Sequence, residues 1–351
     1  MRVARCYSFT DVRVEEIPEP RIGPGEALVR VRVCGVCTGE AMPWYVNQKC
    51  PAVLGHEPVG TIVRLIRGRG SPPFRIGDRV FFHHHTSCGR CVDCRRGHPT
   101  LCGEFHQTRL DPGGFAEYVR IPRLNLQKDT LKIPPAVPDE DAVLIEPLAC
   151  SIHAVKRLHL KKGDTVLIIG TGIMGLLNIQ SAKLAGAGKI LACDLKADRL
   201  RAALRVGATA AFKPDLGRLR RETAGRGADC VMVGPPNVEA LAWGFQAAAP
   251  GATIQLFAPM PPDARIRPNF HDLYFKEQSV TTSYSCDSSD TRDALKLLAA
   301  GKIRTKGLIT HRYGLDGVGR ALWETYKGKH ILKAAIYPGL VGHSRRRSSS
   351  V

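Results

Sequence analysis

A glycine-rich stretch in the middle of the chain constrains the fold more than any other. Residues 165–169 (TVLII) form a short apolar, β-branched run, as expected of a buried strand. The sequence GTGIMG follows at 170–175, and a helical stretch begins at Leu176. A second apolar run, 189–193, ends on Asp194. A glycine motif between a strand and a helix, followed about 20 residues on by an acid, is typical of a dinucleotide-binding βαβ unit.

Each glycine of this motif has a separate physical role. Gly170 can make the tight turn, Gly172 lets the backbone approach a pyrophosphate, and Gly175 lets the helix pack closely on the strand. The helix N-terminus, at Ile173 and Met174, offers free N–H groups to the phosphates. A glycine-rich turn in another kind of α/β domain, or one that binds a different nucleotide, is the alternative.

Asp194 bears on the choice of cofactor. Its carboxylate would accept hydrogen bonds from the adenosine ribose hydroxyls and repel a 2′-phosphate, which favours NAD over NADP. Lys196, Arg199 and Arg201 follow closely and could soften that repulsion.

Composition narrows the remaining classes. The 351 residues are enough for two domains, and no apolar run approaches the roughly 20 residues of a membrane-spanning helix. The N-terminus has no apolar signal core, so we expect a cytoplasmic protein. The net charge of +19 suggests polyanions, but the basic residues are scattered. We therefore expect neither a membrane nor a nucleic-acid partner, and a disordered basic tail at 339–351.

Two clusters in the first third suggest a metal centre. Cys34 and Cys37 form a CxxC, which is either a redox pair or a metal ligand, Cys37, beside a buried thiol. His56 and Glu57 lie in GHEPVG at 55–60, and with Cys37 they supply the sulfur, nitrogen and oxygen donors that suit zinc. Glu146 is a further candidate.

Cys150 is the rival of Glu146 as a ligand. The two residues are four apart, so on a helix they would share a face. A catalytic zinc needs three protein ligands and one open position, so not all of these candidates are required.

Four further cysteines form a compact motif. Cys88, Cys91, Cys94 and Cys102 have the spacing C-x2-C-x2-C-x7-C, which suits a closed tetrahedral zinc site; an iron–sulfur cluster is the alternative. Such a zinc stabilises a loop that lacks a core of its own and takes no part in chemistry. The triplet His83-His84-His85 precedes this motif. Consecutive residues of a strand alternate faces, so we interpret the three as surface or pocket-wall histidines.

Taken together, these motifs resemble the zinc-dependent medium-chain alcohol dehydrogenases, above all the sorbitol, threonine and polyol dehydrogenase branch. The resemblance covers about residues 1–338. It rests on GVC at 35–37, GHEPVG at 55–60, GDRV at 77–80, GGFAEY at 113–118, EPL at 146–148 and the glycine motif at 170–175.

The resemblance implies roles for individual residues. The residues that match Cys37 and His56 bind the catalytic zinc, and we favour Glu57 as the third ligand, with Glu146 and Cys150 as alternatives. Glu40 matches an acid that orients the imidazole of the histidine ligand.

The resemblance also bears on proton transfer and on phosphate binding. Gly39 stands where the family usually has a serine or threonine that passes on the substrate proton, so Thr38 or water would take that part. In the family, a basic residue near the position of Lys333 contacts the cofactor phosphates, so the resemblance implies that role for Lys333.

The fold expected is α/β, with two domains. Residues 1–152 would form a mostly-β GroES-like catalytic domain with a structural-zinc lobe. Residues 153–286 would form a Rossmann domain, a doubly wound parallel sheet, because strands and helices alternate there. Residues 287–338 would return to the catalytic domain.

The function expected is hydride transfer between a secondary alcohol and NAD. The substrate would be a small polyol, sugar or amino alcohol, with one catalytic and one structural Zn²⁺ per chain, in a homodimer or homotetramer. The alternatives are a zinc-free reductase of the same fold, and a non-enzymatic nucleotide-sensing or nucleic-acid-binding protein.

Overall fold

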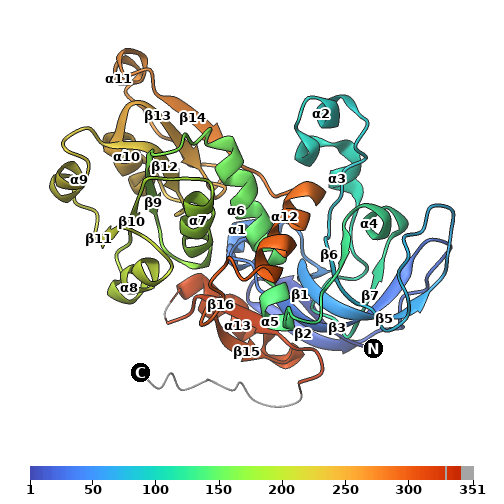
Figure 1. The fold of residues 1–351 in the computed structure, drawn as a ribbon. Coiled ribbons are helices and arrows are strands. Elements are labelled where there is room, and N and C mark those ends of the chain that lie inside the picture. The colour runs from blue at the N-terminus through green and yellow to red at the C-terminus, as the bar shows by residue number, and fades with distance from the viewer. Residues whose placement is uncertain (329, 341–351) are drawn as a thin grey trace. The chain divides into compact units, whose positions relative to one another are not determined.

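The computed structural model describes residues 1–328 and 330–340. The chain divides into two compact units: unit 1 comprises residues 1–147 and 287 onward, and unit 2 comprises residues 148–286 (Figure 1). The division falls inside helix α6 (Ile145–Arg157), a few residues before the boundary expected after residue 152. Of the expected basic tail at 339–351, residues 341–351 lie outside the described residues.

Unit 2 is built on a parallel sheet of six strands in the order β11-β10-β9-β12-β13-β14. Leu167 of β9 pairs with Leu191 of β10 on one side and with Val231 of β12 on the other. These side chains are buried in one core cluster, which confirms the Rossmann architecture expected from the alternating pattern. The strands are β9 (Thr165–Ile169), β10 (Lys189–Cys193), β11 (Ala210–Phe212), β12 (Ala228–Val233), β13 (Ala248–Leu256) and β14 (Ser279–Thr282).

Helices connect these strands. Side chains of Asp215 and Asn237 accept hydrogen bonds from the backbone N–H groups of Arg218 and Ala240, so each caps the helix that follows it. The helices after α6 are α7 (Ile173–Leu184), α8 (Ala197–Arg205), α9 (Leu216–Glu222), α10 (Val238–Ala247) and α11 (Phe270–Phe275).

Unit 1 is rich in β-structure, as expected of a GroES-like domain. One sheet has the order β2-β1-β4; the larger follows the path β15-β16-β3-β5-β6-β8, with β7 paired to β3. The strands are β1 (Arg2–Ser8), β2 (Asp11–Glu16), β3 (Ala27–Gly35), β4 (Ala52–Val53), β5 (Glu57–Leu65), β6 (Arg79–Phe82), β7 (Tyr118–Ile121), β8 (Thr130–Lys132), β15 (Ile309–Tyr313) and β16 (Lys333–Ile336).

Helices occupy the connections of unit 1. They are η1 (Gly39–Ala41), α1 (Pro43–Asn47), α2 (Val92–Arg95), η2 (Pro99–Leu101), α3 (Gly103–Gln107), α4 (Arg123–Lys128), α5 (Asp139–Ala142), α12 (Ser288–Ala299), η3 (Leu315–Gly317) and α13 (Val318–Lys327). No helix within the described ranges has both the length and the apolar character needed to cross a bilayer.

The C-terminal segment completes the sheet of unit 1. In β16, Ala335 pairs with Gly35 and Ile336 pairs with Cys34 of β3. The start of β16, the end of β3 and the start of β5 therefore meet at one end of the sheet. The candidate metal ligands lie next to these strand ends.

Candidate metal and dinucleotide sites

The first candidate site lies where β3 ends and β5 begins. Gly35, the last residue of β3, pairs with Glu57, the first residue of β5. Cys37 follows the one strand and His56 precedes the other, so the sheet register itself brings them together. One ligand atom each of Cys37, His56 and Glu57 lies within 4.8 Å of the other two.

Glu40 joins the two segments that carry these residues. Its Oε1 lies 2.8 Å from His56 Nδ1 and accepts a 2.7 Å hydrogen bond from the Gly55 N–H. Its Oε2 accepts a 3.4 Å bond from the Cys37 N–H. Because Nδ1 is engaged, Nε2 of His56 remains as the metal-binding nitrogen. Burial would raise the pKa of Glu40, but His56 and the two N–H groups outweigh it and lower that pKa, so the carboxylate stays ionised.

Glu57 forms a buried ion pair with Lys333. Lys333 Nζ lies 2.5 Å from Glu57 Oε1 and also contacts Oε2, and both side chains are almost fully buried. Burial raises the pKa of Glu57, and the ammonium group opposes that rise. Lys333 was expected at the cofactor phosphates, and that contact stays a prediction.

Gly35 leaves room for this ion pair. A Cβ added at Gly35 would lie 1.9 Å from Glu57 Oε2 and 3.0 Å from Lys333 Cε. Any larger residue would therefore displace the carboxylate.

The other expected ligands lie on α6, and the expected proton carrier, Thr38, directly follows Cys37. Glu146 and Cys150 both lie on α6, one turn apart. Glu146 is buried, and a carboxylate oxygen lies within 4.8 Å of a ring nitrogen of His83. Thr38 is exposed and immediately precedes η1. A Cβ at Gly39 would meet only Cys37 Sγ, at 3.6 Å.

The second cluster consists of the four cysteines of the predicted lobe. One sulfur from each of Cys88, Cys91, Cys94 and Cys102 lies within 4.8 Å of the others. The backbone N–H groups of Arg90 and Cys91 point at Cys88 Sγ, at 3.4 and 3.3 Å, and lower the pKa of that thiol to about 6. N–H donors that favour a thiolate fit a zinc site, since the thiolate is the form that binds zinc.

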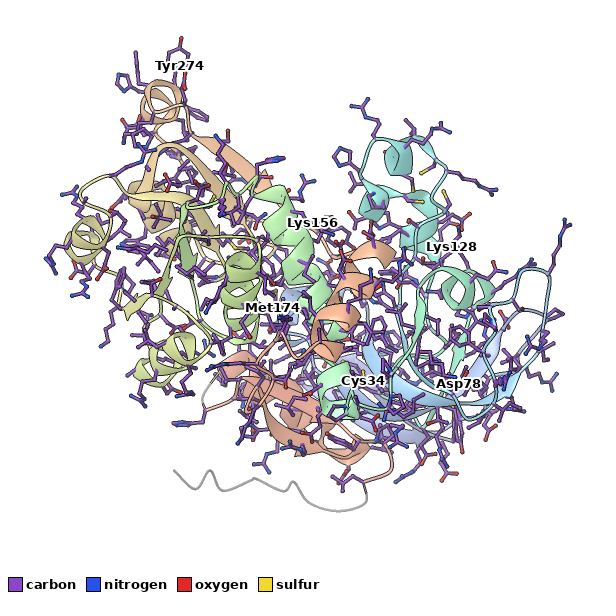
Figure 2. The ribbon with its side chains drawn as sticks, in the orientation of Figure 1. Cys34, Asp78, Lys128, Lys156, Met174 and Tyr274 are labelled. Carbon is purple, nitrogen blue, oxygen red and sulfur yellow. The ribbon has the colours of Figure 1, made fainter. Side chains whose placement is uncertain are left out.

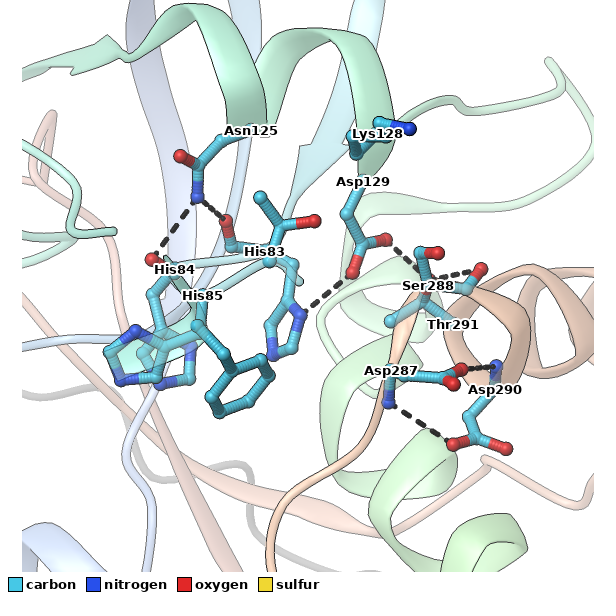
Figure 3. A network of polar contacts seen from close by, with 12 residues as sticks. His83, His84, His85, Asn125, Lys128, Asp129, Asp287, Ser288, Asp290 and Thr291 are labelled. Atoms are coloured by element: carbon cyan, nitrogen blue, oxygen red, sulfur yellow. Dashed lines mark hydrogen bonds and ion pairs between the residues drawn. The ribbon is translucent and has the colours of Figure 1, made fainter. Parts of the chain in front are cut away.

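The three consecutive histidines differ from expectation. Strand β6 ends at Phe82, so they do not alternate across a sheet. His83 is fully buried rather than at the surface, and its Nδ1 lies 2.8 Å from Asp129 Oδ2. His84 and His85 lie beside one another, with ring centroids 4.0 Å apart (Figure 3). Burial, followed by the neighbouring histidines, holds the pKa of His84 well below its usual value.

The glycine turn of unit 2 has the shape that a pyrophosphate requires. Gly170 has a φ of +84°, and a Cβ at Gly175 would lie 2.0 Å from the Gly170 carbonyl oxygen. At Gly172, the residue before α7, a Cβ would meet only Arg199, 3.7 Å away. Ile173 and Met174 open α7, with Met174 at its N-terminal turn (Figure 2). The open face at Gly172 and the helix N-terminus therefore fit a dinucleotide.

Asp194 is tied to this turn. Its Oδ2 accepts a 2.8 Å hydrogen bond from the Thr171 N–H, and its Oδ1 accepts one of 2.9 Å from the Lys196 N–H. Arg199 Nη1 lies 3.8 Å from Oδ2. The acid at the end of β10 thus holds the glycine turn, with a guanidinium close by.

Comparison with known proteins identifies the family of this chain. The profile of the alcohol dehydrogenase GroES-like domain matches residues 23–135, and that of the zinc-binding dehydrogenase domain matches residues 174–300. A sorbitol dehydrogenase of Halalkalibacterium halodurans is 34% identical over 93% of this chain and 95% of its own. The chain belongs to the zinc-binding medium-chain alcohol dehydrogenase family. It is therefore an oxidoreductase, and the non-enzymatic alternative is set aside.

Solved structures of this family share the fold along nearly the whole chain. A zinc-binding dehydrogenase of Sinorhizobium meliloti, bound to NADP, has a TM-score of 0.85 and 29% identity, over 96% of this chain and 99% of that one. An alcohol dehydrogenase of Escherichia coli CFT073, complexed with NADH, has a TM-score of 0.83 and 27% identity, over the same shares of the two chains. The family thus includes members with either nicotinamide cofactor.

Reasoning from the sequence missed two features of the metal site. The ion pair of Lys333 with Glu57 joins residues 276 positions apart, and no local sequence pattern predicts it. Gly35 was part of a quoted motif, but the demand on its missing side chain was not recognised. The signal was present, since a glycine that ends a buried strand two residues before the proposed ligand Cys37 indicates a close approach.

Proposed function

We propose that this dehydrogenase oxidises the secondary alcohol of a polyol, sugar or amino alcohol, with NAD as the hydride acceptor. The observation that carries the proposal is the grouping of Cys37, His56 and Glu57 around one point, with Glu40 fixing the imidazole. One thiolate, one imidazole and one carboxylate leave a fourth tetrahedral position for substrate.

In this proposal, the chain's own residues prepare the site. When bound, zinc supplies a Lewis acid that polarises the alcohol oxygen, and the nicotinamide takes the hydride. Cys37, His56 and Glu57 hold the metal, while Glu40 keeps the histidine ring in a single orientation. Thr38, exposed beside Cys37, passes the hydroxyl proton to solvent, since Gly39 has no hydroxyl.

Lys333 keeps Glu57 available as a ligand. A carboxylate this deeply buried would take up a proton unless a positive charge lay beside it. The ammonium group of Lys333 supplies that charge and also fixes the position of the carboxylate. Glu146, whose negative charge also acts on Glu57, remains the alternative third ligand, as does Cys150.

NAD is favoured over NADP because of Asp194. This acid stands at the end of β10, where a dinucleotide places its adenosine ribose, and it would repel a 2′-phosphate. Arg199, 3.8 Å from the carboxylate, partly offsets that charge. We therefore propose a preference for NAD that is not absolute.

Turnover by metal-ligand variants tests the proposal. Reduced nicotinamide is followed by its absorbance, with NAD or NADP, against simple secondary alcohols, polyols, sugars and amino alcohols. We expect Cys37→Ala and His56→Ala to abolish turnover, to lose one of two zinc ions per chain, and to keep cofactor binding. Full activity in either variant would refute the assignment.

Cys34→Ala is the matched control for these variants. This variant lacks the neighbouring buried thiol and should keep both zinc ions and its activity. If Cys34 and Cys37 were a redox pair, the loss of Cys34 would abolish its function. One zinc ion in the wild type would instead favour a zinc-free reductase of this fold. A homodimer or homotetramer is likewise a proposal, which the sedimentation mass tests.

A further inference from the structure

The three consecutive histidines that follow β6 have different surroundings. His83 Nδ1 lies 2.8 Å from Asp129, and His85 Nδ1 lies 2.7 Å from the Thr108 carbonyl oxygen. The Nδ1 of His84 is buried and hydrogen-bonds to no other described residue. A buried ring nitrogen without a partner is uncommon in a native protein and requires an explanation.

The backbone that carries His84 is held firmly. Asn125 Nδ2 donates hydrogen bonds to the carbonyl oxygens of His83 and His84, at 3.0 and 3.2 Å. Asp129, which lies against the His83 ring, also accepts a 2.5 Å bond from the Thr291 hydroxyl of α12 (Figure 3). His83, Asn125 and Asp129 are completely buried. The backbone that carries the His84 ring is therefore anchored by a buried polar network.

The ring of His84 lies against the candidate metal site. Its centroid is 4.7 Å from that of His56 and 4.0 Å from that of His85. His56 is a proposed ligand, so a molecule bound at the open position would be within reach of the His84 ring. The side chain is only partly buried, and a half-turn about the Cβ–Cγ bond exchanges the places of Nδ1 and Cδ2. Its unpartnered nitrogen can thus face a substrate.

We propose that His84 is a specificity-determining residue, which hydrogen-bonds to the hydroxyl next to the one that is oxidised. The inference rests on the proposed function, and it narrows the substrate to vicinal diols or larger polyols. Imidazole can donate to or accept from a hydroxyl, whereas it offers nothing to the hydrocarbon of a simple secondary alcohol. A site that leaves a polar group unpaired with the wrong substrate discriminates against that substrate.

The first test compares one diol with its mono-alcohol. The ratio of kcat/KM for 2,3-butanediol to that for 2-butanol is measured in wild-type protein and in His84→Phe, which keeps the ring but removes both nitrogens. We expect the wild-type ratio to exceed the variant ratio by about fivefold to tenfold, the effect of one neutral hydrogen bond. His84→Gln, which retains hydrogen-bonding groups, should recover part of the ratio.

His85→Gln is the matched control. Its ring nitrogen already bonds to the protein, so we expect the diol-to-mono-alcohol ratio to stay at the wild-type value. An unchanged ratio in His84→Phe, or an equal drop in His85→Gln, overturns the proposal. Metal content and thermal midpoint of each variant show whether a change reflects lost folding instead.

A binding measurement separates this inference from the proposed function. Calorimetric titration of the zinc-loaded protein with 2,3-butanediol and with 2-butanol needs no turnover. If no secondary alcohol is oxidised, the proposed function fails, and the binding preference still decides the role of His84. Selective diol binding that is lost in His84→Phe supports the role, and equal binding of both alcohols refutes it.

Discussion

At the scale of single residues, the metal site depends on Gly35 having no side chain. Glu57 and Lys333 occupy the space that any side chain at position 35 would need, and only a glycine leaves it open. Glu40 shows the complementary case, because one carboxylate bonds to His56, to Gly55 and to Cys37. Local backbone and local charge together determine where the ligand atoms lie.

We expect Gly35→Ala to disrupt the site. The new Cβ would lie 1.9 Å from Glu57 Oε2, so the carboxylate must move by about 1 Å or more. Displacement on that scale should lower kcat/KM by about a hundredfold, with partial loss of one zinc ion. Steady-state kinetics and metal analysis measure both effects.

Gly39→Ala is the control for added bulk near the ligands. Its Cβ would meet only Cys37 Sγ, at an ordinary 3.6 Å, so the variant should keep both zinc ions. If Gly35→Ala kept its zinc and its rate, Glu57 would be less constrained than its contacts imply.

At the scale of elements, the four-cysteine lobe stands out because it has few apolar residues of its own to bury. Between Cys88 and Cys102 it contains only short helical turns, α2 and η2, and most of its side chains are at least partly exposed. A bound metal replaces the missing core in such a segment.

We expect Cys94→Ser to open this lobe while the catalytic metal stays in place. Three remaining thiolates hold zinc less well, so the protein should lose close to one zinc ion per chain and become sensitive to protease between residues 88 and 107. Limited proteolysis with mass spectrometry locates the cut. Val92→Ser, an exposed change in the same lobe, should behave as wild type. Cleavage elsewhere first would contradict the idea.

At the same scale, the side chain of Glu324 joins α13 to β15. Its carboxylate accepts bonds from Tyr313 OH, at 2.5 Å, and from Arg320 Nε, at 2.6 Å. Burial would raise the pKa of Glu324, but these two donors lower it overall. The folded pKa is therefore below the unfolded value of about 4.3, and the contact stabilises above that pH.

We expect Glu324→Gln to lower the free energy of unfolding by at most about 1 kcal/mol near neutral pH, because solvent screens the pair. The difference from wild type should shrink as the pH falls below about 4, through the folded pKa. Urea unfolding at several pH values measures it, with the exposed Glu239→Gln as control. If the difference in free energy of unfolding between wild type and Glu324→Gln grew as the pH fell, the pKa of Glu324 would not be lowered in the folded protein.

Elements with strong local signals were predicted well. Strands β9 and β10 have the expected bounds, because each is an apolar run that ends at a fixed turn or acid. Helix α11 was not expected, since Phe270, Tyr274 and Phe275 are all more than 70% exposed and form no buried stripe. Figure 2 labels Tyr274 on this helix. The histidine triplet was expected to lie in a strand, but β6 ends at Phe82, and His83 is fully buried.

At the scale of the whole molecule, sequence motifs predicted two sites on two units. They did not predict which strand of unit 1 the C-terminal segment pairs with. Residues 287 onward return to unit 1, and β16 joins the sheet beside β3. The expectation of a return segment came from the family resemblance; periodicity alone does not reveal a partner so far away. Contacts such as Thr291 with Asp129, 162 positions apart, depend on that return.

The split construction of unit 1 also bears on how the chain is made. Residues 148–286 emerge from the ribosome as one continuous segment, so unit 2 can fold before residues 287 onward have been made. Lys333 emerges 276 positions after Glu57, its buried partner. Until then, that carboxylate lacks the charge that makes its burial tolerable. A nascent chain could therefore fold the glycine turn of unit 2 before it could assemble its metal centre, and maturation of the catalyst would wait for β16.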